Sequence, residues 1–167
     1  MSQAPGAIQL RPPRNRYDRR VARWWRAQLL LGTGATVLPL VILGALIAPA
    51  RMWLLLPAVI VAVLGAIAAI ALPIWWYRVH RWEVTERAVY TRTGYFWQSW
   101  RVAPMSRIQT VDTTRGPLQR AYGIATVAVT TASSAGAVAI AGLTQDDAER
   151  VAHDLTLITD ATPGDAT

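Results

Sequence analysis

The chain has 167 residues, of which 53% are hydrophobic, and its mean hydropathy is +0.24. These values are typical of a small membrane protein with room for one modest domain outside the membrane. The net charge of +7 comes from arginine alone because lysine is absent, and the absence of cysteine excludes disulfide and thiolate chemistry.

The first 18 residues are expected to form a disordered basic arm. They include several prolines and arginines and show no apolar periodicity. A nucleic-acid partner is not expected, because no folded basic face or recognition motif accompanies the charge. We expect the arm to be attracted instead to an anionic inner leaflet, where each arginine contributes about 1 kcal/mol.

Two apolar runs follow, and each is long enough to cross a bilayer. Residues 27–48 and 52–77 contain no charged side chain, and a hydrocarbon core of ~30 Å requires about 20 such residues in a helix. Because residues 49–51 alone separate the runs, residues 19–78 are expected to form a transmembrane helical hairpin. A cleaved signal peptide is disfavoured, since the first run is too long and a second span follows at once.

Aromatic and basic residues mark the ends of both spans. Tryptophan and tyrosine gather at the headgroup level of membranes, and cytoplasmic segments carry an excess of basic residues. Seven arginines precede the first span, and Arg78 and Arg81 follow the second, whereas the turn contains only Arg51. Both termini are therefore expected in the cytoplasm, at a cell membrane. The expected membrane-interface anchors are Arg23, Trp24, Trp25, Arg26, Trp53, Trp75, Trp76, Tyr77 and Arg78.

Small residues recur within the spans and allow close helix packing. We expect them to pack the two helices of one hairpin, with an intermolecular contact as the alternative. No ionisable group lies inside the spans, which disfavours an ion pathway. The small residues concerned are Gly32, Gly34, Ala58, Ala62, Gly65, Ala66 and Ala69.

From residue 79 the pattern changes to short β-rich runs separated by turns, which predicts a domain over residues 79–160. The expected strands cover residues 82–85, 88–93, 95–103, 107–114, 125–132 and 137–143. A final helix is expected after Thr144, a suitable N-cap with Asp147 at the third helical position. Residues 161–167 are expected to be a disordered tail. The apolar face that should close a small barrel comprises Ala148, Val151, Leu155 and Ile158.

Several short motifs of this domain, taken together, carry a resemblance to a known family. They are the strand Ile108-Gln109-Thr110-Val111, the step Leu118-Gln119-Arg120 and the pair Tyr122-Gly123, with Trp82-Glu83-Val84-Thr85 before them and Thr130-Thr131-Ala132 after them. With the double span, they resemble the YdbS-like bacterial pleckstrin-homology (PH) family. The resemblance implies an α+β membrane protein, in which a two-helix transmembrane hairpin precedes a small PH-like β-barrel or sandwich capped by a C-terminal helix. It brings no catalytic residues.

No set of side chains predicts catalysis, so we expect a noncatalytic protein without metal or cofactor. His80 and His153 lack neighbours spaced as metal ligands. Ser133 and Ser134 lie in a predicted turn with no base nearby, where turn chemistry is the simpler interpretation.

Two stretches are candidate binding surfaces. One presents Tyr95, Phe96 and Trp97 near Arg92 and Arg101, and it could contact the inner leaflet or a partner, although core packing is expected for at least two of the aromatics. The other combines side chains that can bind phosphate or carboxylate. Its alternative is structural, and we favour Arg120 as a brace that hydrogen-bonds turn carbonyls. The second stretch contains Arg115, Gln119, Arg120 and Tyr122.

The expected function is protein–protein assembly by the cytoplasmic PH-like domain at the inner face of the membrane. The resemblance implies a homo-oligomer or a second PH-domain membrane protein as partner. Recognition of anionic lipid headgroups is the first alternative, and a role as accessory subunit of a transporter or envelope complex is the second.

Overall fold

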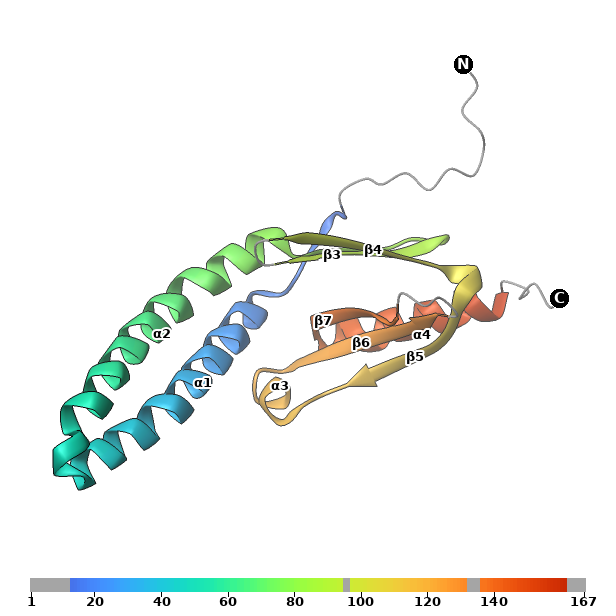
Figure 1. Cartoon of the computed structure of the whole chain (residues 1–167). Helices are drawn as coiled ribbons and strands as arrows, with labels where there is room; N and C mark the ends of the chain where they lie inside the picture. Colours follow the sequence, from blue (N-terminus) through green and yellow to red (C-terminus); the bar gives the residue numbers. More distant parts are fainter. Residues whose placement is uncertain (1–12, 95–96, 132–135, 162–167) are drawn as a thin grey trace, which may run out of the picture.

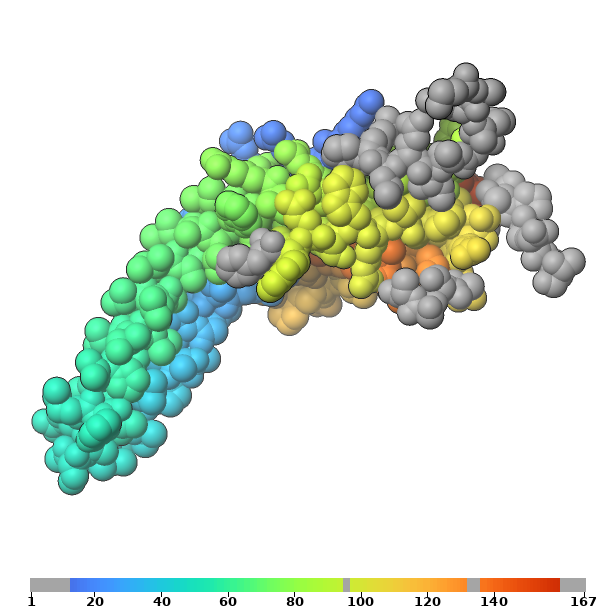
Figure 2. All heavy atoms as spheres, turned by 45° about the horizontal axis from the view of Figure 1, so that its top comes forward, coloured from blue at the N-terminus to red at the C-terminus, as the bar shows by residue number. Residues whose placement is uncertain are grey.

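Two long helices project from one end of a β-sheet domain (Figure 1). The structure is a computed structural model that describes residues 13–94, 97–131 and 136–161. Helix α1 (Arg19–Leu46) and helix α2 (Arg51–Val79) run antiparallel and are joined by the short 3-10 turn η1 (Ala48–Ala50). Both are long and apolar enough to cross a membrane, and most of their apolar side chains are exposed. The hairpin extends clear of the domain (Figure 2), which leaves its surface free for lipid.

Small residues form the seam between α1 and α2. Ala58 and Ala69 are buried, and a Cβ on Gly65 would lie 2.3 Å from Thr33 Oγ1. The interpretation that small residues pack the hairpin is therefore confirmed for these three positions. It is wrong for Gly32 and Gly34, which are exposed and would place a Cβ in open space.

The domain consists of two antiparallel sheets stacked as a sandwich (Figure 1). The first has the order β1-β2-β3-β4 and the second the order β5-β6-β7, with α3 between β5 and β6 and α4 after β7. This architecture confirms the predicted fold class. The elements are β1 (Asn15–Arg16), β2 (Arg81–Val84), β3 (Ala88–Gly94), β4 (Gln98–Pro104), η2 (Met105–Arg107), β5 (Ile108–Thr114), α3 (Pro117–Ala121), β6 (Ile124–Thr131), β7 (Val138–Thr144) and α4 (Gln145–Ala161).

Helix α4 closes the core as expected. Its buried face packs against β5, β6 and β7, with Ala148 and Leu155 fully buried and Ile158 partly so. Thr144 caps the helix, because its Oγ1 accepts from the backbone N–H of Asp147 at 3.1 Å and donates to the Asp147 carboxylate at 2.8 Å. The predicted N-cap is confirmed.

Two parts of the fold differ from the sequence-based expectation. Disorder was predicted through residue 18, but residues 13–18 belong to the fold, and the earlier part of the arm lies outside the described residues. Asn15 and Arg16 pair with Trp82 and Arg81, and Tyr17 is only 3% exposed. The physical reason is that β2 would otherwise be an unpaired edge. The second difference is α3, where a turn was expected.

The hairpin and the domain share one hydrophobic core. Val21, in the first turn of α1, is fully buried in the same cluster as Ile124, Ile140 and Leu155. It lies against β7 at Gly142, where the backbone has φ +90° and an added Cβ would come within 2.4 Å of Val21 Cγ2. Glycine therefore serves two purposes here, a left-handed backbone and close approach of a helix.

We predict that Gly142→Ala destabilises the protein more than Gly136→Ala does. Both glycines have positive φ, so both changes incur backbone strain of about 1–2 kcal/mol, but no atom lies within 4 Å of a Cβ at position 136. Overpacking against Val21 should add about 1–3 kcal/mol at position 142. Thermal melting of the full chain in detergent measures the difference. Val21→Ala should recover part of it, and equal losses from both substitutions would contradict the shared-core interpretation.

Candidate functional site

The β3–β4 turn lies at the end of the domain nearest the membrane hairpin. Strand β2 begins two residues after α2 ends, and Arg92 of β3 stands opposite Arg81, the first residue of β2. The chain beyond Arg92 therefore runs back alongside the end of α2, and β3 contacts α2 directly. This turn is membrane-proximal if the hairpin spans a bilayer.

Near the β3–β4 turn, the Trp97 side chain is exposed, whereas the Arg92 and Arg101 side chains contact other residues. Trp97 is 87% exposed, so it does not take part in core packing. The Arg92 guanidinium lies over the Trp100 ring at 5.3 Å and donates to Gln98 Oε1 at 2.7 Å. Arg101 donates to the Ala137 carbonyl at 2.9 Å. Of this predicted surface, Tyr95 and Phe96 lie outside the described residues.

Three arginines form a row across the outer face of the first sheet. Arg16, Arg81 and Arg92 are consecutive cross-strand neighbours, and Trp100 continues the row on β4. Burial, followed by the charges of Arg16 and Arg92, lowers the pKa of Arg81. Adjacent like charges on neighbouring strands are unfavourable. Glu83, two residues after Arg81, brings an acidic side chain to the same face of the sheet. Sequence reasoning missed this row because strand register cannot be read from arginine spacing.

The segment from Arg115 to Tyr122 is held by Gln119. Its Oε1 accepts from the Gly116 N–H at 3.0 Å, and its Nε2 donates to Thr126 Oγ1 at 2.9 Å. Gln119 is 9% exposed, whereas Arg120 is exposed and its guanidinium has no hydrogen bond to a described residue. The interpretation of Arg120 as the brace is wrong, because the buried side-chain amide of Gln119 makes the hydrogen bonds that hold this turn.

The remaining members of this segment are also tied to the fold. Arg115 donates to Gln145 Oε1 at 2.7 Å and so fastens the segment to the start of α4. Tyr122 packs, partly buried, against the core. Of the four predicted side chains, Arg120 therefore remains the one most accessible to an external ligand within the structure described.

An aromatic cluster joins the hairpin to the domain. Trp25 lies 5.6 Å from Trp76, 5.1 Å from His80 and 6.5 Å from Tyr17, measured between ring centroids. His80 Nδ1 is 2.9 Å from the Trp76 carbonyl, which can only accept, so Nδ1 carries the proton. Burial lowers the pKa of His80, and the hydrogen bond to the Trp76 carbonyl acts in the opposite direction. Burial also raises the pKa of the Tyr17 hydroxyl.

The cluster revises the list of expected membrane-interface anchors. Trp25 is 9% exposed, and its ring faces the domain and α2, which contradicts a lipid-facing role. Trp24, Trp76 and Tyr77 are partly buried against the core. The positions that remain exposed are Arg23, Arg26, Trp53, Trp75 and Arg78.

Arg26 supplies a hydrogen-bond donor that is missing from the backbone of α2. Pro73 lacks an N–H, so the carbonyl of Ala69, four residues earlier, has no partner from the helix ladder. The Arg26 Nε donates to that carbonyl oxygen at 3.2 Å. An unpaired carbonyl at the membrane boundary is costly, so Arg26 has a structural role beside its charge.

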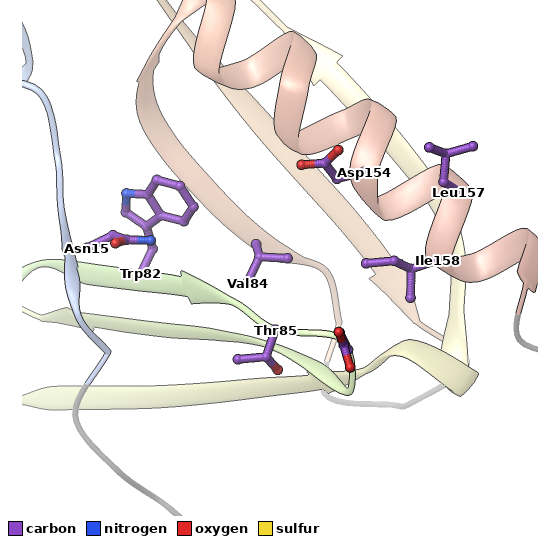
Figure 3. Close-up of a pocket in the computed structure, with 8 residues that line it drawn as sticks. Asn15, Trp82, Val84, Thr85, Asp154, Leu157 and Ile158 are labelled. Atoms are coloured by element: carbon purple, nitrogen blue, oxygen red, sulfur yellow. The ribbon is translucent and has the colours of Figure 1, made fainter.

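A groove separates β2 from α4 at the end of β2 farthest from α2. In Figure 3, Trp82 and Val84 from the sheet face Asp154 and Ile158 from the helix. The groove has a volume of about 520 Å³. The full lining is Asn15, Trp82, Val84, Thr85, Glu86, Asp154, Leu157 and Ile158.

The chemistry of this groove is apolar with acidic rims. Glu86 and Asp154 bring carboxylates to opposite walls, in a chain whose net charge is +7. The Trp82 Nε1–H is buried and has no acceptor among the described residues. A ligand with cationic and apolar side chains would match the acidic rims and the apolar lining.

The described residues contain no group of three or more metal-ligating side chains. His80 lies in the aromatic cluster and His153 on the exposed side of α4. Neither the groove nor the arginine row contains a histidine.

Comparisons with known proteins match nearly the whole chain. A sequence model of the family described as Bacterial PH domain matches residues 30–157, from the first span to the last helix. Over 160 residues the chain is 29% identical to UPF0699 transmembrane protein YdbS of Bacillus subtilis (strain 168). That alignment covers 92% of this chain and 97% of the relative. No solved structure matches the chain.

We predict that Arg26 and Pro73 are energetically coupled. Arg26→Met keeps the apolar stem but removes the donor, and should lower stability by about 1–3 kcal/mol because the Ala69 carbonyl loses its partner. In a Pro73→Ala background, the restored N–H can bond that carbonyl, so the same change should cost much less. A double-mutant cycle on melting of the full chain measures the coupling. Arg23→Met serves as control, and additive effects would refute the assignment.

We predict opposite sensitivities for two neighbours in α3. Gln119→Leu keeps the size of the side chain but removes both hydrogen bonds, so stability should fall by about 1–3 kcal/mol. Arg120→Ala should change stability by less than about 0.5 kcal/mol, as is usual for exposed sites. Melting curves of both variants decide the point, and a strongly destabilised Arg120→Ala would reinstate the bracing role.

Proposed function

The chain belongs to the Bacterial PH domain family as a YdbS-like transmembrane protein, and we propose that its domain is a noncatalytic assembly module. The module binds a segment of a partner protein beside the membrane. The observation that carries this proposal is the groove between β2 and α4, with its apolar lining and acidic rims.

The chemistry of the groove favours a protein segment over a lipid. Glu86 and Asp154 repel anionic headgroups and attract arginine or lysine. Val84, Leu157 and Ile158 provide apolar contacts, and Leu157 is 54% exposed.

The partner is a second copy of this chain or another PH-domain membrane protein. The N-terminal sequence of this chain has the chemistry that the groove requires, since Ile8 and Leu10 alternate with polar residues and Arg11 follows. We propose that this arm of one copy occupies the groove of another. A second PH-domain protein with a similar basic and apolar segment is the other outcome.

A crosslinking experiment tests this assembly. A photoreactive amino acid at Leu157, on the groove, should give one discrete adduct when the full chain is irradiated in its native membrane. The same group at His153, exposed on α4 but outside the groove, should not. Peptide mapping should place the crosslink on residues 8–14 of a second copy, or on a basic segment of a PH-domain protein.

Reversal of charge provides the matched control for this crosslink. Glu86→Arg with Asp154→Arg should abolish the adduct at Leu157 while melting changes little, because both carboxylates lie at exposed positions. Equal adducts from positions 157 and 153, or an adduct insensitive to charge reversal, would refute the proposed groove.

We further propose that both termini lie in the cytoplasm. The arginine excess on the domain side supports this orientation, and the pairing of β1 with β2 keeps residue 15 and the domain on one side of the hairpin. At the same end, the exposed Trp97 is suited to lie among headgroups, which favours membrane contact by the domain as a second role.

Single cysteines test this orientation, since the chain has none of its own. A membrane-impermeant maleimide should label Thr156→Cys in inverted vesicles and Ala48→Cys in right-side-out vesicles. A fluorophore on Trp97→Cys should be quenched by brominated lipid, whereas one on Thr156→Cys should not. Labelling of the opposite sides would overturn the orientation, and an unquenched Trp97→Cys probe would refute the membrane contact.

A further inference from the structure

A second recess lies away from the domain groove, between the domain-side ends of α1 and α2. Its volume is about 390 Å³. The small side chain of Ala22 leaves the space open on the α1 side, and Pro73 forms a buried wall on the α2 side. The full lining is Arg19, Ala22, Pro73, Ile74, Tyr77 and Arg78.

The outer end of this crevice carries two unneutralised charges. Arg19 begins α1 and Arg78 lies one residue before the end of α2, and both are exposed. In the part of the chain that the structure describes, neither has an acidic partner. Asp18, next to Arg19, instead accepts from the Arg20 backbone N–H at 2.7 Å, with the Arg20 Nε at 3.9 Å. Paired guanidinium groups of this kind bind phosphate well.

The inner end of the crevice is apolar at a suitable depth. Ile74 is one helical turn from Arg78, which corresponds to about 6 Å along the helix. The polar headgroup layer on each side of a bilayer is about 5–7 Å thick, so a phosphate held at Arg78 places the start of an acyl chain beside Ile74. Tyr77, partly buried between these levels, has an apolar ring and a hydroxyl that suit the boundary.

We propose that this crevice binds one anionic phospholipid. Arg19 and Arg78 hold the phosphate, and Pro73 and Ile74 contact the upper part of an acyl chain. An anionic headgroup is selected because two guanidinium charges face it, whereas the ammonium of a zwitterionic lipid would oppose them. The site lies in the hairpin and is independent of the proposed assembly through the domain groove.

Native mass spectrometry of the full chain in detergent tests the site. Dioleoylphosphatidylglycerol should bind with a stoichiometry of one and at least about tenfold tighter than dioleoylphosphatidylethanolamine. Arg19→Gln with Arg78→Gln should remove most of this preference, an apparent loss of about tenfold. The matched control is Arg14→Gln with Arg87→Gln, which removes the same charge from exposed positions outside the crevice and should change binding by less than about twofold.

A steric variant separates a built site from diffuse attraction to the basic surface. Ala22→Leu fills the crevice and leaves every charge in place, so phosphatidylglycerol binding should fall about fivefold while the melting temperature stays within a few degrees. Three results would overturn the proposal: equal losses in the crevice and control pairs, unchanged binding by a folded Ala22→Leu variant, or equal binding of the two lipids.

Discussion

Insertion of the first turn of α1 into the domain core is the contact on which the rest of the structure depends. Val21 is fully buried against Gly142 of β7, and Trp25 continues the contact to Trp76 and His80. The helix that enters the membrane is therefore also a core element of the domain. A domain cut off at residue 79 would expose this part of its core, so its binding properties belong to the full chain.

This shared core separates two chemically different surfaces. Arginines gather where the helices meet the domain, in the crevice at Arg19 and Arg78 and in the row that includes Arg81. The acidic groove with Asp154 lies at the other end of β2. Because the shared core fixes the domain to the hairpin, the basic surface lies beside the helix ends and the acidic groove has a separate lining.

Local patterns in the sequence determined the hairpin, the positions of β2 to β7 along the chain and the last helix. Two uncharged runs fix the spans, since their length alone matches a bilayer. Thr144 and Asp147 mark the start of α4 because a cap needs only neighbouring residues. The motif from Ile108 to Gly123 also consists of residues close together in the sequence, and it indicated the PH family. The match of the family model to residues 30–157 agrees with that indication.

Tertiary structure alone decided which polar side chains are engaged and which are available. Arg120 looked like the brace of its turn, but Gln119 reaches inward to Thr126, a partner chosen by strand packing. Arg26 looked like an anchor, yet it bonds a carbonyl 43 residues away that Pro73 leaves unpaired. The arginine row depends on register across three strands. Such contacts join residues far apart in sequence, and no local periodicity records them, because they arise only when separate elements pack together.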